Sequence, residues 1–150
     1  TMEPEFLVLD EPVSNLDVSI QAQIINLFLD LKEKFALTYL FISHDLNLVS
    51  FLSDEIAVMF RGRIVEQAPT EEIVGNPLHP YTIKLFSSVP KIDGTITRGK
   101  EAETAEEAPA EEGKGCRFAS QCPKACAECR DSKPPLRDIG GGHLIACHKA

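Results

Sequence analysis

This sequence of 150 residues predicts an α/β fold built on a parallel sheet, and three observations support the prediction. Short apolar runs typical of buried strands alternate with segments whose apolar residues recur at helical spacing. The order strand, helix, strand, helix is typical of parallel sheets, because two parallel strands need a long crossover between them. Residues 55–68 then show two strand-like runs, which predict an antiparallel hairpin.

The first strand and helix are predicted within residues 5–35. The run "EFLVLD" is apolar until it ends in a charge, which predicts a strand buried on both faces of a parallel sheet. Asp17 is a candidate cap for a helix that continues to Phe35. One apolar stripe along this helix consists of Ile20, Ile24, Leu27 and Leu31.

The elements that follow are predicted by the same patterns. "LTYLFIS" (residues 37–43) reads as a second buried strand, and "HDLNLVSFLSD" returns to helical spacing. In "EIAVMFRGRIVEQA" two strand-like runs are split at Arg61 and Gly62. Beyond the hairpin we expect a short helix opened by Thr70, and a second one with Pro80 in its first turn, where a missing N–H costs nothing.

Composition divides the chain into three predicted regions. Residues 1–90 carry the α/β pattern, residues 91–115 form an acidic, flexible linker, and residues 116–150 hold all five cysteines. The linker carries Glu101, Glu103, Glu106, Glu107, Glu111 and Glu112, without which the net charge would be −2 instead of −8. No basic cluster remains, so the sequence predicts no nucleic-acid partner.

The sequence gives no sign of export or of membrane insertion. No apolar run approaches the roughly 18 residues that are needed to cross a bilayer. The opening "TMEPEF" lacks both the basic flank and the apolar stretch of a secretory signal. We therefore expect a cytoplasmic chain.

Charged residues stand at the carboxyl end of each predicted parallel strand, which is where α/β proteins place their ligands. Asp10 and Glu11 follow the first strand, and His44 follows the second in "FISHD". Two adjacent carboxylates repel each other unless one faces a cation and the other a water molecule to be activated. An isolated pair of this kind could equally be two solvated acids, but a histidine at the next strand end favours a catalytic site.

"LDEPVSNLD" followed by "FISHD" resembles the second half of an ATP-binding cassette (ABC) ATPase, a class of P-loop NTPases. The resemblance implies that Asp10 is the Walker B aspartate on the Mg²⁺ side and Glu11 the catalytic base. It further implies that Ser14 to Asp17 form a loop at a dimer interface, and that His44 contacts the γ-phosphate of ATP. A histidine suits that role, because one ring nitrogen can donate to a phosphate oxygen.

A later stretch narrows the resemblance. Asn76 to Thr82 read Asn-Pro-Leu-His-Pro-Tyr-Thr, which is similar to a stretch in the ATPase subunits of oligopeptide and dipeptide importers. Taken alone, His79 and Tyr81 could be plain packing residues at a helix start. In this order after the preceding motifs, they indicate the peptide-importer branch of the ABC ATPases.

Three family motifs are absent from the sequence. It contains no Gly-rich P-loop of the form G-x-x-x-x-G-K-[ST], no glutamine-containing loop and no Leu-Ser-Gly-Gly-Gln signature. We therefore expect the carboxyl-terminal part of a longer subunit, and we expect this fragment alone to be inactive toward ATP. We also expect it to expose apolar sheet edges that promote aggregation.

The cysteines predict a metal site. Cys116, Cys122, Cys126, Cys129 and Cys147 lie close together in a chain with no export signal, where metal binding is more common than disulfides. Four thiolates can bind zinc or an iron–sulfur cluster. Zinc sites usually show a C-x2-C pair at both ends, and only Cys126 and Cys129 form one here. His143 and His148 are candidate ligands only if the metal is zinc.

The peptide-importer ATPases carry a cysteine segment of the form C-x5-C-x6-C, with a distant cysteine before a histidine. Cys116, Cys122, Cys129 and Cys147 match it, and the resemblance implies a [4Fe-4S] cluster, with zinc less favoured. Cys126 departs from this pattern and is a spare thiol or an alternate ligand. It creates a C-x3-C-x2-C spacing similar to radical S-adenosylmethionine enzymes, but about 30 residues cannot build their barrel. We expect the metal to stabilise a small tail rather than to transfer electrons.

The resemblance implies a function for the intact subunit. Two ATPase subunits, identical or merely similar, would close on two ATP molecules and drive transmembrane permease subunits at the cytoplasmic face of the membrane. An extracytoplasmic binding protein would deliver the peptide or related solute. The alternative is a stand-alone metal-binding or interaction module whose ATPase-like half is a degenerate scaffold.

Overall fold

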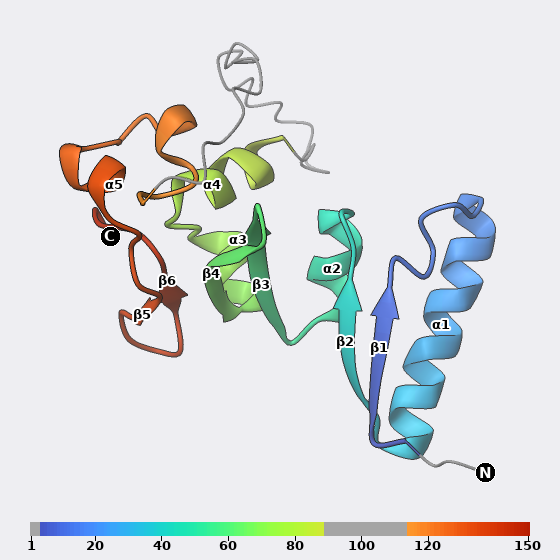
Figure 1. Ribbon diagram of the computed structural model, residues 1–150. Helices are drawn as coiled ribbons and strands as arrows, with labels where there is room; N and C mark the ends of the chain where they lie inside the picture. The colour runs from blue at the N-terminus through green and yellow to red at the C-terminus, as the bar shows by residue number, and fades with distance from the viewer. Residues whose placement is uncertain (1–3, 89–113) are drawn as a thin grey trace. The chain divides into compact units, whose positions relative to one another are not determined.

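The computed structural model describes residues 4–88 and 114–150 (Figure 1). The predicted linker, residues 91–115, thus lies almost entirely outside the described residues. The chain forms two compact units, Thr1–Leu52 and Ser53–Ala150. One unit contains a parallel pair of strands and the other an antiparallel sheet, so the predicted α/β class is confirmed.

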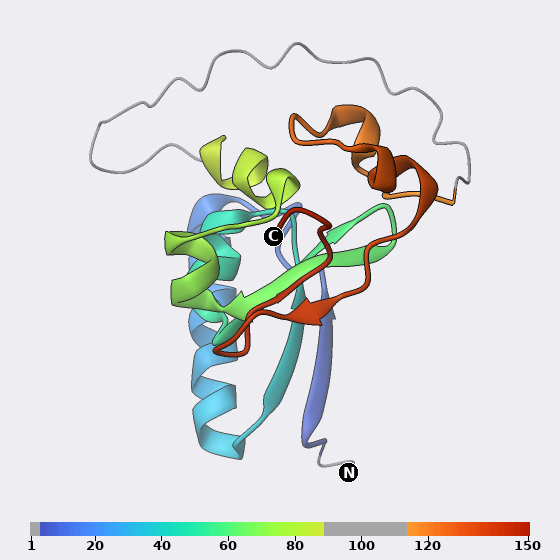
Figure 2. The same ribbon diagram turned by 90° about the vertical axis from the view of Figure 1, so that its left-hand side faces the viewer.

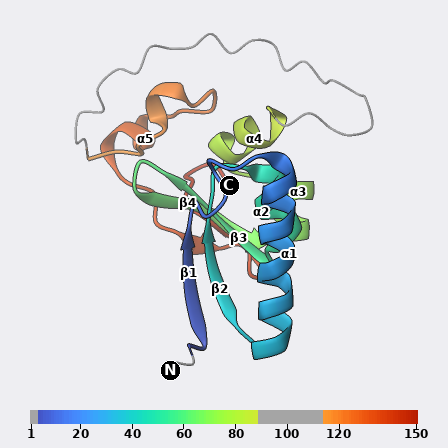
Figure 3. The same cartoon turned by 90° about the vertical axis from the view of Figure 1, so that its right-hand side faces the viewer.

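The first unit has the predicted order of elements. It consists of β1 (Phe6–Asp10), α1 (Val18–Phe35), β2 (Thr38–Ile42) and α2 (Leu46–Leu52). The two strands are parallel, with a register that runs from Phe6 opposite Thr38 to Asp10 opposite Ile42. Both strands therefore end side by side at their carboxyl ends, and Figure 3 shows α1 running along the pair.

Helix α1 begins where the sequence predicts, immediately after Asp17. The Asp17 side chain makes no capping hydrogen bond, so the predicted role of its carboxylate as a cap is wrong. The helix ends at Phe35, and the C-cap residue that follows, Ala36, adopts the left-handed conformation with φ 51°. A contact with β2 fixes the helix against the strands: the Tyr39 hydroxyl donates to the Phe28 carbonyl oxygen at 3.0 Å, and the two rings meet edge to face.

The two parallel strands have one half-buried face and one exposed face. Their outer face exposes Phe6 and Val8 of β1 together with Leu40 and Ile42 of β2. The prediction that these strands are buried on both faces is therefore wrong for the described chain. A two-stranded sheet with a helix on one side leaves the alternate side chains in solvent, and an apolar patch of this kind usually marks a surface that another element covers.

The second unit is built on the predicted hairpin. Strands β3 (Glu55–Phe60) and β4 (Arg63–Pro69) are antiparallel and are joined at Arg61 and Gly62. Both turn residues have positive φ, 47° and 75°, as a two-residue type I′ turn requires. The register shifts between Val58 and Met59, which marks a β-bulge.

Gly62→Ala is expected to lower the free energy of unfolding by about 1–2 kcal/mol, because an L-residue pays that cost in the left-handed region. An added Cβ would come within 3.5 Å of Arg117 Nη1, an ordinary contact, so the loss would be conformational. Gly75→Ala is the matched control, since its Cβ would meet nothing within 4 Å. Urea unfolding of both variants checks this, and equal stability of the two would contradict it.

Two short strands near the chain end complete the second sheet. Strands β5 (Arg137–Asp138) and β6 (Leu144–Ile145) give the order β3-β4-β6-β5, all antiparallel. Glu66 of β4 lies opposite Ile145 of β6, and the Ala146 N–H donates to the Val65 carbonyl oxygen at 2.9 Å. Figure 2 shows the red strand β6 beside the green hairpin. The cysteine-containing segment is thereby joined to the hairpin by backbone pairing, which the sequence patterns do not predict.

Helices complete this unit. The predicted helices after the hairpin are present as α3 (Thr70–Gly75) and α4 (Pro80–Ser87), and the cysteine segment contains α5 (Ala127–Asp131) and a 3₁₀ turn (Ala119–Gln121). The most deeply buried apolar side chains are Ala68, Ile73, Phe118 and Ile145. The core is therefore shared between the hairpin, α3 and the cysteine segment. In the part of the chain that the structure describes, no helix combines the length and apolar character that a bilayer span needs.

Candidate functional site

The strongest polar contact at the carboxyl end of the parallel strands joins Glu11 to His44. Glu11 Oε1 lies 2.9 Å from His44 Nδ1, although the two residues are 33 positions apart in sequence. The parallel register explains this closeness, because Asp10 and Ile42 are paired at the last position of β1 and β2. The sequence predicted these two residues as catalytic, and the structure brings them together at the predicted edge.

The backbone at Glu11 is held in an unusual conformation. Its φ of 45° lies in the left-handed region, which is uncommon for a residue with a side chain. The Glu11 N–H donates to the Ile42 carbonyl oxygen at 2.9 Å, and the Ser14 hydroxyl donates to the Glu11 carbonyl oxygen at 3.2 Å. These contacts maintain the sharp turn that aims the Glu11 side chain at His44. Such strain in an ordered chain is often found at functional sites.

The two side chains shift each other's titration. The hydrogen bond from His44, and secondarily its charge, lowers the pKa of the Glu11 carboxyl. The same hydrogen bond, followed by the charges of Glu11 and Asp45, raises the pKa of His44 above 6.5. Both side chains are accessible to solvent, so the pair can exchange its proton with water or with a bound ligand. The arrangement suits a carboxylate that activates water beside an imidazole.

The His44 pKa is expected to lie above 6.5 and to fall toward that value in Glu11→Gln. The stabilising effect of the His44 charge is complete below 6.5 and is lost as the pH rises through the raised pKa. The effect of the Glu11 charge is complete above 4.5 and is lost as the pH falls through the lowered pKa. NMR titration of the imidazole protons measures both. An unchanged His44 pKa in Glu11→Gln would contradict the pairing.

The other residues predicted for this site lie around the same edge. Asp10 is exposed as the last residue of β1, and Ser14 is bound to the Glu11 carbonyl oxygen. Asp17 stands at the start of α1 with its side chain exposed. Asp45, which the sequence reading did not single out, caps α2, because its Oδ1 accepts from the N–H groups of Asn47 and Leu48 at 3.0 and 3.2 Å. The predicted loop from Ser14 to Asp17 is thus solvent-facing.

A second polar centre, buried in the other unit, is formed by Glu66. Its carboxylate is fully buried and accepts three hydrogen bonds, from Leu78 N at 2.8 Å, from His79 N at 2.9 Å and from His143 Nε2 at 2.7 Å. These partners belong to the segment before α4 and to the glycine-rich turn before β6. Glu66 therefore ties β4 to both neighbouring segments.

The Asn76 to Thr82 stretch has a packing role in the structure. The His79 imidazole caps α4 by accepting from Tyr81 N at 3.1 Å, and burial lowers its pKa. The Tyr81 ring lies 4.6 Å from that of Phe60 and 5.5 Å from that of Phe118, measured between centroids. The stretch therefore connects the hairpin to the cysteine segment.

Sequence reasoning missed the centre at Glu66. The only sign of this centre in the sequence is a charged residue within the apolar strand "RIVEQA". Such a residue is either exposed to solvent or buried with hydrogen-bond partners, and the sequence does not distinguish the two. The cysteine-rich context makes His143 a candidate ligand only for zinc, and the structure pairs it with Glu66 instead. His148, the other candidate, lies 3.3 Å from Glu128 through Nδ1.

The five thiols share one neighbourhood. Burial raises the pKa of Cys122, and the charges of Cys147 and Cys116 raise it further. The Sγ atoms of Cys126 and Cys129 are 3.2 Å apart, and the hydrogen bond from Cys129 lowers the pKa of Cys126. Cys126, which departs from the expected ligand pattern, is thus in direct contact with Cys129, one of the predicted ligands.

This grouping does not close into a metal site. Within residues 4–88 and 114–150, no three His, Cys, Asp or Glu side chains are close enough to hold a metal ion together. The described arrangement of the cysteines therefore does not fit a four-thiolate cage. Cys129 is instead engaged with Cys126, the residue that departs from the expected ligand pattern.

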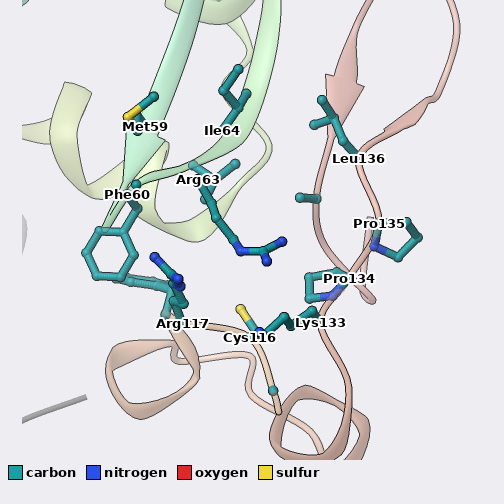
Figure 4. Close-up of a pocket in the computed structure, with 15 residues that line it drawn as sticks. Met59, Phe60, Arg63, Ile64, Cys116, Arg117, Lys133, Pro134, Pro135 and Leu136 are labelled. Atoms are coloured by element: carbon teal, nitrogen blue, oxygen red, sulfur yellow. The ribbon is translucent and has the colours of Figure 1, made fainter. Parts of the chain in front are cut away.

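A pocket of about 470 Å³ lies between the hairpin turn and the cysteine segment. Figure 4 shows the Arg63 guanidinium inside it, above Cys116. Arg117 and Lys133 also line the pocket, and no acidic side chain among the described residues forms an ion pair with any of these three cations. Among the described residues this positive charge has no acidic partner, which predicts that the pocket attracts anions.

Comparison with known proteins identifies the chain's relatives. The family model for the oligopeptide/dipeptide transporter C-terminal region matches residues 65–129. The oligopeptide transport ATP-binding protein AppF of Bacillus subtilis is 46% identical over 99% of this chain and 46% of its own length. The dipeptide transport ATP-binding protein DppF of Haemophilus influenzae is 44% identical over 97% of this chain and 45% of its own length.

A solved structure of an ATP-binding cassette of an ABC transporter, in its ADP conformation, is 27% identical, with a TM-score of 0.45 over 57% of this chain and 34% of that chain. The sequence matches define the class as ATP-binding proteins of ABC transporters. Within that class the chain belongs to the oligopeptide and dipeptide transporter family, whose carboxyl-terminal region it matches. It spans about half the length of the relatives named above.

Proposed function

We propose that this chain is part of an ATP-hydrolysing subunit that energises the import of peptides or related small solutes through an ABC transporter. The observation that carries the proposal is the contact of Glu11 with His44 at 2.9 Å, at the carboxyl end of two adjacent parallel strands. The relatives' roles in oligopeptide and dipeptide transport support the class of solute.

The proposed chemistry assigns one task to each side chain. Asp10 is a hard oxygen ligand at an exposed strand end, and it would hold Mg²⁺ that neutralises phosphate charge. Glu11 would accept a proton from the attacking water, and its lowered pKa keeps it ionised for that purpose. His44, whose raised pKa favours the protonated form, would donate to the γ-phosphate oxygen.

The exposed surfaces of the first unit support assembly with further protein. The outer face of β1 and β2 is apolar and uncovered, as expected if helices from the rest of a P-loop NTPase domain pack against it. The solvent-facing loop from Ser14 to Asp17 is available for a second ATPase subunit, identical or similar. Permease subunits would then hold the pair at the cytoplasmic face of the membrane, with an extracytoplasmic binding protein supplying the solute.

The domain limits belong to the same proposal. Residues 1–90 would be the carboxyl-terminal part of the ATPase domain, residues 91–115 an acidic linker and residues 116–150 a cysteine-rich module. The pairing of β6 with β4 implies that this module is attached to the hairpin by backbone hydrogen bonds as well as by the linker. Deleting residues 91–112 while keeping both ends would test whether the linker itself has a role.

The proposal is tested by restoring the upstream part of the subunit, which is expected to carry the missing P-loop. The 150-residue chain alone is expected to neither bind ATP tightly nor hydrolyse it, because it lacks the P-loop. A version extended by the upstream coding sequence is expected to do both. If the upstream sequence encodes no P-loop, the transporter assignment fails, and the rival, a stand-alone metal-binding or interaction module, gains support.

An iron–sulfur cluster on Cys116, Cys122, Cys129 and Cys147 is kept as a separate proposal that rests on sequence spacing. Since the described thiols do not close into a cage, binding would require the loops around them to rearrange. Iron, sulfide and absorption near 400 nm after anaerobic purification test it. Zinc without sulfide, or no metal at all, would overturn it.

A further inference from the structure

We propose that Cys126 and Cys129 form a reversible intramolecular disulfide, which makes this pair an oxidation site in the cysteine segment. Their Sγ atoms lie 3.2 Å apart. A disulfide bond is about 2.0 Å long, so the two sulfurs need to approach each other by only about 1 Å to form it. Among the described residues, which include all five cysteines, no other two thiols are in contact.

The local backbone brings these two thiols together. Cys126 is the residue before α5 and Cys129 lies in its first turn, so the spacing of three places both side chains on the same side. The Cys129 N–H donates to the Cys126 carbonyl oxygen at 3.1 Å, which fixes the turn between them. The contact is therefore a property of the folded segment and not of two free side chains.

The two thiols differ in access to solvent, which orders the reaction. Cys126 is partly exposed, whereas Cys129 is buried. A peroxide would therefore reach Cys126 first. Attack of its sulfur on hydrogen peroxide breaks the O–O bond and gives a sulfenic acid and one water molecule. Cys129 sulfur then attacks the sulfenic sulfur and a second water leaves, so the two thiols lose two electrons and two protons and the peroxide becomes two waters.

The reverse reaction needs only a dithiol reductant, which attacks one sulfur and then resolves the mixed disulfide. Oxidation at this pair would also have a consequence for metal binding. A sulfur in a disulfide is no thiolate ligand, so the oxidised pair and a ligand set that includes Cys129 exclude each other. This consequence rests on the cluster proposal above, but disulfide formation itself does not.

The sequence makes the disulfide simple to detect by peptide mapping. Trypsin cleavage after Lys124 and Arg130 places both cysteines in one peptide, residues 125–130. The full chain, stripped of metal with a chelator, is treated with hydrogen peroxide, alkylated with iodoacetamide, digested and measured by mass spectrometry. We expect this peptide to be unalkylated and lighter by two hydrogens, and dithiothreitol before alkylation to restore two alkyl groups.

Other peptides supply internal controls. Cys122 lies within residues 118–124 and Cys147 within residues 138–149, and both are expected to remain alkylated. Cys116→Ser should leave the 125–130 disulfide unchanged, whereas Cys126→Ser should leave Cys129 reduced and alkylated. A disulfide that joins Cys129 to any other cysteine, or peptide 125–130 fully alkylated after peroxide treatment, would overturn the proposal.

Folding dependence distinguishes a built pair from a chance reaction of a C-x2-C sequence. Preorganisation of the two sulfurs predicts that the equilibrium constant for this disulfide, measured against reduced and oxidised glutathione, is at least about tenfold larger in the native chain than in guanidinium-unfolded chain. Samples equilibrated in glutathione buffers of known ratio are quenched with iodoacetamide, and the oxidised fraction of peptide 125–130 is measured. Equal constants in the two conditions would mean that the fold contributes nothing, and would contradict the proposal.

Discussion

In the complete subunit, Glu11→Gln is expected to reduce ATP hydrolysis by about 10²- to 10⁴-fold, the usual contribution of a general base. ATP binding should persist, because the substitution removes a proton acceptor and leaves the phosphate-binding elements intact. The amide cannot take a proton from water, but it is close in shape to the carboxylate. Steady-state phosphate release and equilibrium ATP binding, measured on the same preparation, separate the two effects.

Glu33→Gln provides the matched control for this experiment. Glu33 is an exposed carboxylate on α1 and takes no part in the contact between Glu11 and His44. Its replacement should leave hydrolysis within about twofold of the parent, because exposed substitutions away from a site have small effects. If Glu11→Gln hydrolyses ATP as fast as Glu33→Gln, Glu11 is not the base. The juxtaposition with His44 would then need a structural explanation.

Glu66→Ala is expected to lower the free energy of unfolding by about 3–5 kcal/mol, the range for breaking a buried charged network. The substitution would leave the N–H groups of Leu78 and His79 and the His143 ring without their shared acceptor in the interior. Each unsatisfied buried donor adds a desolvation cost of about 1–3 kcal/mol. Guanidinium unfolding of the chain, monitored by circular dichroism, measures the loss.

Glu55→Ala, on the neighbouring strand, separates this effect from the simple removal of a carboxylate. Glu55 is exposed on β3, where its Oε1 accepts one hydrogen bond, from Gln67 Nε2 at 2.9 Å. Its loss should cost no more than about 0.5 kcal/mol, because water replaces the partner. Similar losses for the two variants would show that the Glu66 centre does not hold the second unit together.

Local patterns were sufficient to predict the elements whose partners are close in sequence. The hairpin follows from Arg61 and Gly62, which accept the positive φ of its turn. The helix after Asp17 follows from one apolar stripe. The contact of Glu11 with His44 could also be predicted. Adjacent parallel strands end at the same edge of the sheet, so the residues that follow them lie close together.

Contacts between distant segments could not be predicted in this way. Glu66 and His143 are 77 positions apart, and each residue alone is ambiguous in the sequence. Strands β5 and β6 have two residues each, too short for any alternation of apolar and polar side chains to be visible. A local sequence pattern also does not show which neighbours surround a residue. For this reason two predictions were wrong: capping of α1 by the Asp17 side chain, and burial of the parallel strands on both faces.

During synthesis, β4 leaves the ribosome well before β6, since the segments that follow it in sequence must be made first. The strand order β3-β4-β6-β5 means that one edge of the nascent hairpin waits for Leu144 and Ile145 before its backbone groups are paired. Open edges of this kind invite pairing with other chains. Premature termination before Leu144 would therefore release a polypeptide with a permanent template for aggregation, and quality control by chaperones would be most needed in that interval.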